Sequence, residues 1–225
     1  MSNFHRHHGC SRCGGRDRHH HGRCQNNIQC GTPTTNPCGL LGPFVAINPD
    51  CVVQPRSTAS IIPFSSGTVP AVLVTTALGL VGTTSAIGFG TSVPGITISA
   101  LNTIDLGVLP SEAFVVPREG NITALSASFI TTLAFAAATG PTTIRAQIYR
   151  APEGSTTFTA TGAFVDLAPP IPAPIAVGAV STGNGSFAPV PVSVGDRLLL
   201  VFSATTSTAV AVTVTGNAAA GITIE

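Results

Sequence analysis

The sequence predicts an all-β protein, and three observations carry that prediction. A short apolar run at 198–202 directly follows the turn residues Gly-Asp-Arg at 195–197, a pattern typical of a strand buried on both faces. The segments 122–135 and 142–150 alternate with the period of a strand. The 24 Gly and 18 Pro supply turns between short strands. Because a strand buried twice needs a second sheet or a partner subunit over it, we expect a β-sandwich that assembles.

The first part of the β region, residues 57–104, carries no charged residue. Within it, 69–90 is apolar enough to raise the question of a membrane span. Thr, Ser and Pro interrupt this stretch, glycines break it at 79, 82, 88 and 90, and no Arg, Trp or Tyr flanks it. Since a membrane helix needs an unbroken apolar run with interfacial anchors, we expect short strands here.

The later part alternates more clearly. In 122–135 every second residue from 125 lies on one predicted face, and in 142–150 an Ile-Ala-Ile face alternates with an Arg-Gln-Tyr face. Beyond these we expect a turn at 151–156 leading into a further strand, a Pro-rich crossover at 168–174, a strand near 175–181, a turn at 183–186, the strand at 195–204 and two closing strands. Eight or more strands without an amphipathic helix indicate a β-sandwich or a jelly roll.

Two asparagines, Asn121 and Asn184, head glycosylation sequons. We interpret both as turn residues.

Charge is scarce and unevenly distributed. Charged residues make up 8% of the chain, against about 25% in typical proteins, and none of them is lysine. A surface made mainly of small, uncharged residues is typical of a protein that becomes part of an assembly.

All six Cys and six His lie within 1–56, whose net charge is +4, whereas 57–225 carries −3. We predict a disordered or extended Cys/His/Arg-rich arm at 1–30, a Pro-rich connector at 31–56 and a β domain at 57–225. The arm lacks the apolar run of a signal peptide.

The cysteines are predicted to form disulfides between chains, because thiols on a flexible arm beside an associating domain meet partners at high effective concentration. They are Cys10, Cys13, Cys24, Cys30, Cys38 and Cys51. A zinc site on the arm is a second interpretation, since thiolate and imidazole are ligands that zinc prefers; no other cofactor is expected. Its candidate ligands are Cys10, Cys13, His5, His7, His8, His19, His20 and His21.

The connector holds an apolar patch at 39–47 that can add to a sheet edge, dock on a partner or cover its own domain. Its candidate contact residues are Leu40, Leu41, Pro43, Phe44, Val45 and Ile47.

Catalysis finds little support, because from residue 57 on there is no His or Cys to act as general base or thiol nucleophile. Nor do the five Arg of residues 1–23 come with the lysines and interleaved aromatics that favour nucleic-acid binding. We therefore expect no enzyme, no nucleic-acid partner and no membrane partner.

Several motifs in order carry a family resemblance. They are STASIIPFSSG (57–67), LGLVGTTSAIGFG (78–90), TIDL (103–106), AFVVPREGNITALSASF (113–129), IRAQIYRAP (144–152) and GDRLLLVFSA (195–204). Together they resemble the C-terminal domain of the BclB-type exosporium glycoproteins of Bacillus spores.

The resemblance implies a jelly roll of the tumour-necrosis-factor and complement-head kind that forms a trimer. It also implies synthesis in the mother cell, without a signal peptide, and a place on the spore surface. Family members commonly carry a collagen-like Gly-X-Y region before this domain, and this chain has a Cys-rich arm instead.

The sequence thus favours a structural spore-surface subunit, in an exosporium layer or an appendage fibre. It would trimerise through the β domain and link to itself and to other exosporium or coat proteins through the arm. The alternative is an adhesion head that recognises a surface, receptor or glycan and is anchored by the arm.

Overall fold

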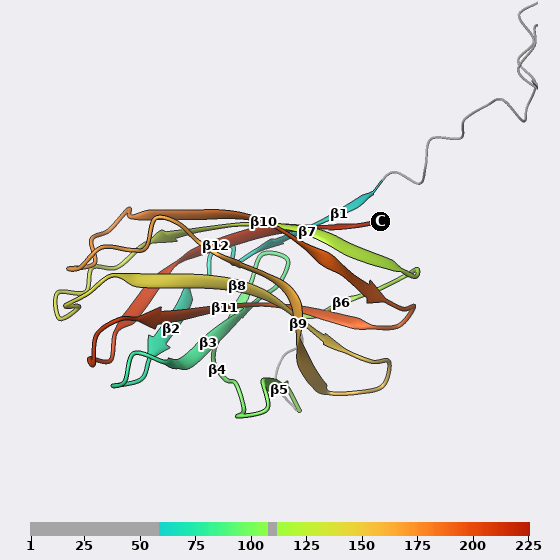
Figure 1. The fold of residues 1–225 in the computed structure, drawn as a ribbon, viewed down its shortest axis with the longest axis horizontal. Helices are drawn as coiled ribbons and strands as arrows, with labels where there is room; N and C mark the ends of the chain where they lie inside the picture. Colours follow the sequence, from blue (N-terminus) through green and yellow to red (C-terminus); the bar gives the residue numbers. More distant parts are fainter. Residues whose placement is uncertain (1–58, 108–111) are drawn as a thin grey trace, which may run out of the picture. The chain divides into compact units, whose positions relative to one another are not determined.

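The computed structural model describes residues 59–107 and 112–225, which form twelve strands and no helix (Figure 1). Accordingly, no helix of these ranges could cross a membrane. The strands are β1 (Ser60–Ser65), β2 (Ala71–Thr75), β3 (Val81–Ile87), β4 (Ser92–Thr97), β5 (Thr103–Asp105), β6 (Phe114–Val115), β7 (Gly120–Thr131), β8 (Thr142–Ala151), β9 (Thr157–Asp166), β10 (Val180–Val192), β11 (Arg197–Thr206) and β12 (Thr213–Ile224).

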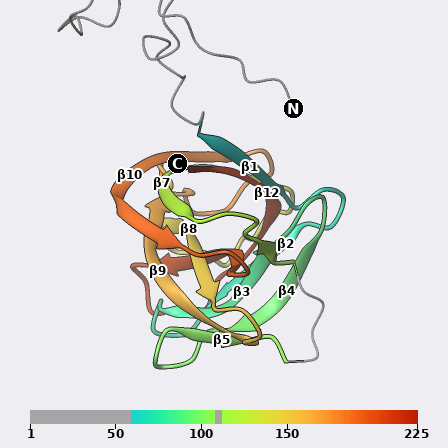
Figure 2. The ribbon, with the colours of Figure 1, turned by 90° about the vertical axis from the view of Figure 1, so that its right-hand side faces the viewer.

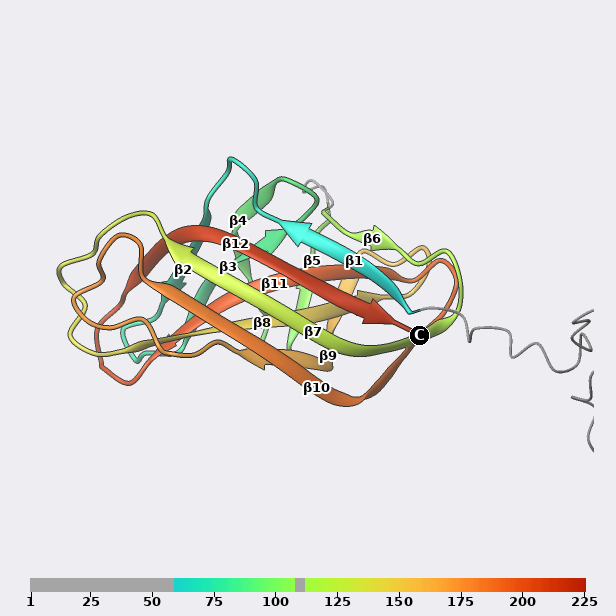
Figure 3. The ribbon, with the colours of Figure 1, turned by 90° about the horizontal axis from the view of Figure 1, so that it is seen from above.

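Eight of these strands form two facing layers (Figures 1 and 2). Layer I has the order β1-β12-β7-β10, as Figure 3 shows from above, and layer II the order β3-β11-β8-β9. Counted along the chain, the eight strands follow the orders 1-8-3-6 and 2-7-4-5, which interleave the two layers as in a jelly roll. β2 pairs with both β12 and β3, so the layers join at that edge. The predicted all-β jelly roll is confirmed.

The main core lies between the layers and is built by strand alternation. In β7 the residues that point inward include Leu125, Ala127 and Phe129, as the sequence predicted. From the other layer β11 contributes Phe202, whose ring centroid lies 6.2 Å from that of Phe129. Both rings are fully buried, so this pair joins the two layers near the centre of the sandwich.

β11 is buried on both faces, as its apolar run predicted. Its outward residues Leu199 and Val201 belong to a second core cluster on the outer face of layer II. Residues 92–107, which contain β4 and β5, contribute Ile96 and Ile104 to that cluster; we call them the cover segment. The chain itself therefore buries the second face of β11, and this burial gives no support to a partner subunit.

The strand expected near 175–181 and the turn expected at 183–186 are wrong. The Gly-Asn-Gly of 183–185 lies inside β10, where Asn184 pairs with Ser126 of β7. A Cβ on Gly183 would come within 2.8 Å of the Val165 side chain, so this glycine permits a close approach to β9. Asn121 likewise lies in a strand, β7, and neither sequon asparagine is a turn residue.

The strands expected in 69–90 are confirmed as β2 and β3. Gly79 lies in the turn between them with a φ of +76°, a conformation that favours glycine. Gly82 lies within β3 and does not end a strand.

Candidate functional site

The site residues proposed from the sequence lie outside the described residues. They are the six cysteines Cys10 to Cys51, the six histidines His5 to His21 and the patch Leu40 to Ile47. The predicted segments 1–30 and 31–56 lie there too, so their roles stay predictions. Within 59–107 and 112–225, no three His, Cys, Asp or Glu side chains come together as a metal site would require.

The outer face of layer I is the first candidate surface in the part of the chain that the structure describes. Its central row consists of Ser65, Ala219, Ser128 and Thr182, one residue from each strand in register. The next row is Pro63, Gly221, Ser126 and Asn184. These rows present small side chains, and the Oγ of Ser126 donates a 2.7 Å hydrogen bond to the Oδ1 of Asn184 within the face.

Larger apolar residues lie toward the ends of this layer I face. Ile130 and Val180 pair at one end and are 42% and 50% exposed, and Ile61 at the other end is 76% exposed. None of the four strands contains a charged residue. Arg118, whose Nη2 donates to the Oγ of Ser60 at 3.1 Å, and Glu225 lie at the end that holds Ile61. Covering the rows between the two ends would desolvate no ion, and ion desolvation is the main cost of burying a polar surface.

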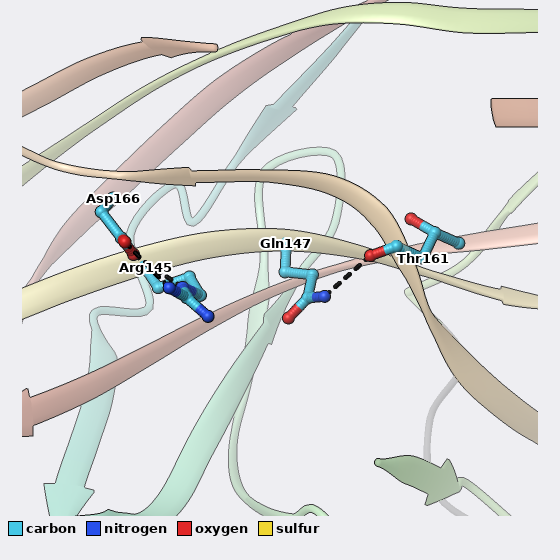
Figure 4. Close-up of polar contacts among 4 residues, drawn as sticks. All are labelled: Arg145, Gln147, Thr161 and Asp166. Carbon is cyan, nitrogen blue, oxygen red and sulfur yellow. Dashed lines mark hydrogen bonds and ion pairs between the residues drawn. The ribbon is translucent and has the colours of Figure 1, made fainter. Parts of the chain in front are cut away.

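The outer face of layer II is the second candidate surface. One part of it lies under the cover segment, and another part carries an ion pair between neighbouring strands (Figure 4). Arg145 of β8 donates from Nε and Nη2 to the two carboxylate oxygens of Asp166 of β9, at 2.6 and 2.8 Å. The guanidinium also lies over the ring of Phe164, 4.5 Å from its centroid.

This ion pair changes the pKa of both groups. The hydrogen bond from Arg145 lowers the pKa of Asp166, and the same bond raises the pKa of Arg145. Both side chains are nearly half exposed. The pair is therefore a solvated, neutral unit whose contribution to stability is small.

Gln147 and Tyr149 follow Arg145 on the same face of β8. The Nε2 of Gln147 donates a 2.8 Å hydrogen bond to the carbonyl oxygen of Thr161 in β9 (Figure 4). Tyr149 is 3% exposed, and this burial raises the pKa of its phenol.

Arg145, Gln147 and Tyr149 line an open cleft of about 340 Å³. Its other lining residues come from β11, the start of β3 and the cover segment: Leu80, Val81, Ile98, Ser99, Asn102 and Ser203. The alternation in 142–150 placed the Arg-Gln-Tyr residues on one face, as observed. The sequence carried no signal for Asp166 as the partner of Arg145, or for Ser203 and the cover segment as walls of a cleft.

No family model matches the chain. In an alignment of 150 residues, the chain is 33% identical to collagen-like protein 1 of Acanthamoeba polyphaga mimivirus; the alignment covers 62% of this chain and 16% of that protein. Among solved structures, Eiger TNF from S. frugiperda is similar with a TM-score of 0.34 and 11% identity, over 74% of this chain and 92% of that one. The chain thus resembles a small part of a longer collagen-like protein, and the jelly-roll assignment rests on its own strand order.

Proposed function

We propose that the chain is a structural subunit that forms trimers through the layer I face and is linked into larger assemblies by its N-terminal arm. The observation that carries the proposal is the layer I face, whose two middle rows consist of small residues and whose four strands contain no charged residue. Since burial of such a face costs no ion desolvation, another copy of the chain suits it. No catalytic role is part of this proposal.

The number three is supported by the collagen-like relative. A collagen triple helix winds three chains together, so a domain carried by such chains would lie beside two other copies. The similarity covers 16% of that relative, and trimerisation of the present chain is therefore part of the proposal.

The motifs shared with the exosporium glycoproteins support a place on the spore surface, after synthesis in the mother cell. All six of them overlap described strands, from STASIIPFSSG on β1 to GDRLLLVFSA on β11. The proposed partners are further copies of the chain and other exosporium or coat proteins, with no nucleic acid or membrane among them. Fibre and layer are both compatible with such a subunit.

The arm is proposed to link neighbouring trimers through its cysteines once the mother cell has lysed and the thiols meet oxygen. The apolar patch at 39–47 would dock on a neighbour. Zinc binding by the same Cys and His residues is the competing role, and it predicts stoichiometric uptake that the loss of Cys10 and Cys13 abolishes.

The test is to purify the full chain and measure its mass by light scattering and its form by electron microscopy, with and without reductant. We expect filaments or sheets that separate into trimers when disulfides are reduced. A chain truncated to 57–225 is the control, and it should remain trimeric without forming larger assemblies. Monomers in reductant contradict the trimer, and assemblies that form without residues 1–56 contradict the role of the arm.

A second role, an adhesion head, is favoured by the cleft on layer II. Cavities that bind small ligands combine apolar walls with a few convergent polar groups, and this cleft has both. The two roles use opposite faces of the sandwich, so one subunit can have both.

A further inference from the structure

The cleft on layer II contains two hydroxyl groups without hydrogen-bond partners in the part of the chain that the structure describes. Tyr149 is 3% exposed and Ser203 is 8% exposed, and neither hydroxyl makes a hydrogen bond to a described residue. Neither oxygen is sealed off from solvent, and both residues line the cleft. Because both hydroxyls open into the cleft and have no partner among the described residues, they are available to bond a molecule that enters it.

Other residues that line the cleft also carry hydrogen-bonding groups. Arg145 has Nε and Nη2 engaged by Asp166, which leaves Nη1 without a partner among the described residues. Gln147 donates from Nε2 to Thr161, which leaves its amide oxygen as an acceptor. Asn102, in the cover segment, also lines the cleft and carries a side-chain amide. The cleft therefore offers donors and acceptors together.

The charge of the cleft restricts the ligand. The carboxylate of Asp166 neutralises Arg145 at 2.6 Å, so an anion meets no net positive charge. No group of three metal-binding side chains exists in the described ranges, which disfavours a cation. Leu80, Val81 and Ile98 supply apolar walls. A neutral molecule with several hydroxyls and an apolar C–H surface matches this set of groups.

A second, smaller cleft of about 190 Å³ continues along the same face. Val81, Arg145 and Ser203 line both clefts, and Thr143, Asp166 and Thr205 line the second alone. The carboxylate of Asp166 adds an acceptor there. The two clefts together thus provide room for two adjoining units of one ligand.

We infer that the layer II clefts bind a neutral saccharide, with one sugar unit against Tyr149, Ser203 and Arg145 and the next beside Asp166. The inference deepens the adhesion role proposed above and rests on it. It does not depend on the trimer, because the layer I face lies on the other side of the sandwich.

Tyr149 allows a direct test, since the chain has one Tyr and no Trp and its intrinsic fluorescence reports on this cleft alone. The full chain is titrated with methyl glycosides of glucose, galactose, mannose, rhamnose and N-acetylglucosamine. We expect a saturable change of emission with at least one of them, and transfer of magnetisation to the sugar protons in saturation-transfer NMR.

Three variants locate the site. S203A and Y149F each remove one open hydroxyl and keep the packing, and each should weaken binding about three- to tenfold, the value of a typical hydrogen bond; Y149F is followed by NMR. T157A removes an exposed hydroxyl of β9 that lines neither cleft, and it should bind as the unmodified chain does.

Three results would overturn the inference. They are no saturable response to any of the five glycosides, undiminished binding by both S203A and Y149F, and tighter binding of methyl glucuronide than of methyl glucoside. The mass of the reduced assembly is measured on the same samples. Trimers that bind no sugar would therefore contradict only the saccharide site, and monomers that bind sugar would contradict only the proposed trimer.

Discussion

The two outer faces of the sandwich are completed in different ways. The four strands of layer I contain no charged residue and present rows of Ser, Ala, Gly and Thr. The four strands of layer II contain Arg145, Arg150, Asp166 and Arg197, and the cover segment buries part of their outer face. The chain thus covers part of layer II with its own cover segment, whereas the outer face of layer I is suited to contact with another copy of the chain.

Because of this difference, the feature that favours assembly is the layer I face and not the buried strand β11. The twice-buried strand β11 suggested a partner subunit, yet Leu199 and Val201 are covered by the same chain. What favours a partner is the absence of charge on layer I, and four predictions test the contrast between the two faces.

The largest effect is expected from a charge in the centre of layer I. Ala219 lies between Ser65 and Ser128 in the central row, so A219R would bury an unpaired guanidinium in the proposed interface. Because an unpaired buried charge costs several kcal/mol, trimers should give way to monomers in light scattering. T157R, at an exposed position of layer II, is the matched control, and an A219R chain that stays trimeric would place the interface elsewhere.

The next effect concerns the cover of layer II. L199A should lower the free energy of unfolding by about 2–5 kcal/mol, the usual cost of a large-to-small change in a packed core. I130A on layer I should cost far less, because Ile130 is 42% exposed. Both are measured by urea unfolding in the monomeric A219R background, so that assembly adds nothing to stability. Equal costs would mean that the cover segment does not pack as a core.

A smaller effect is expected at high pH. Burial raises the pKa of Tyr149, with Arg145 acting in the opposite direction. Ultraviolet titration of this single tyrosine should give a midpoint above the ordinary value of about 10. In the urea-unfolded chain the midpoint should lie at that ordinary value. Since the unfolded phenol ionises first, stability should fall as pH rises from about 10 through the folded pKa. An unshifted midpoint would show that solvent reaches the phenol freely.

The smallest effect is expected from the ion pair on layer II. D166N should cost less than about 1 kcal/mol at neutral pH, because both partners are partly exposed. Arg145 lowers the pKa of Asp166, so its contribution is present above about pH 4 and is lost as pH falls through the folded value. The difference in stability between the unmodified chain and D166N should therefore vanish in acid. A difference that persists there would assign it to something other than the ion pair.

The sequence by itself determined the fold class and several faces. Alternation in β7 and β8 gave the inward Leu125, Ala127 and Phe129 and the outward Arg145, Gln147 and Tyr149, because side chains of a strand alternate whatever lies around it. The apolar run of β11 predicted burial on both sides. These properties are local, and neighbouring residues alone encode them.

Only the tertiary structure decided what covers each face and where the cleft lies. Arg145 meets Asp166 through a strand register that contains an irregularity between Gln147 and Tyr149, and Ser203 and Asn102 reach the cleft from segments far apart in the chain. The Gly-Asn-Gly of β10 predicts a turn by its composition, but in the structure Gly183 allows β10 to approach β9 closely. Register, cover and close approach depend on which segments become neighbours after folding, and local periodicity carries no information about that.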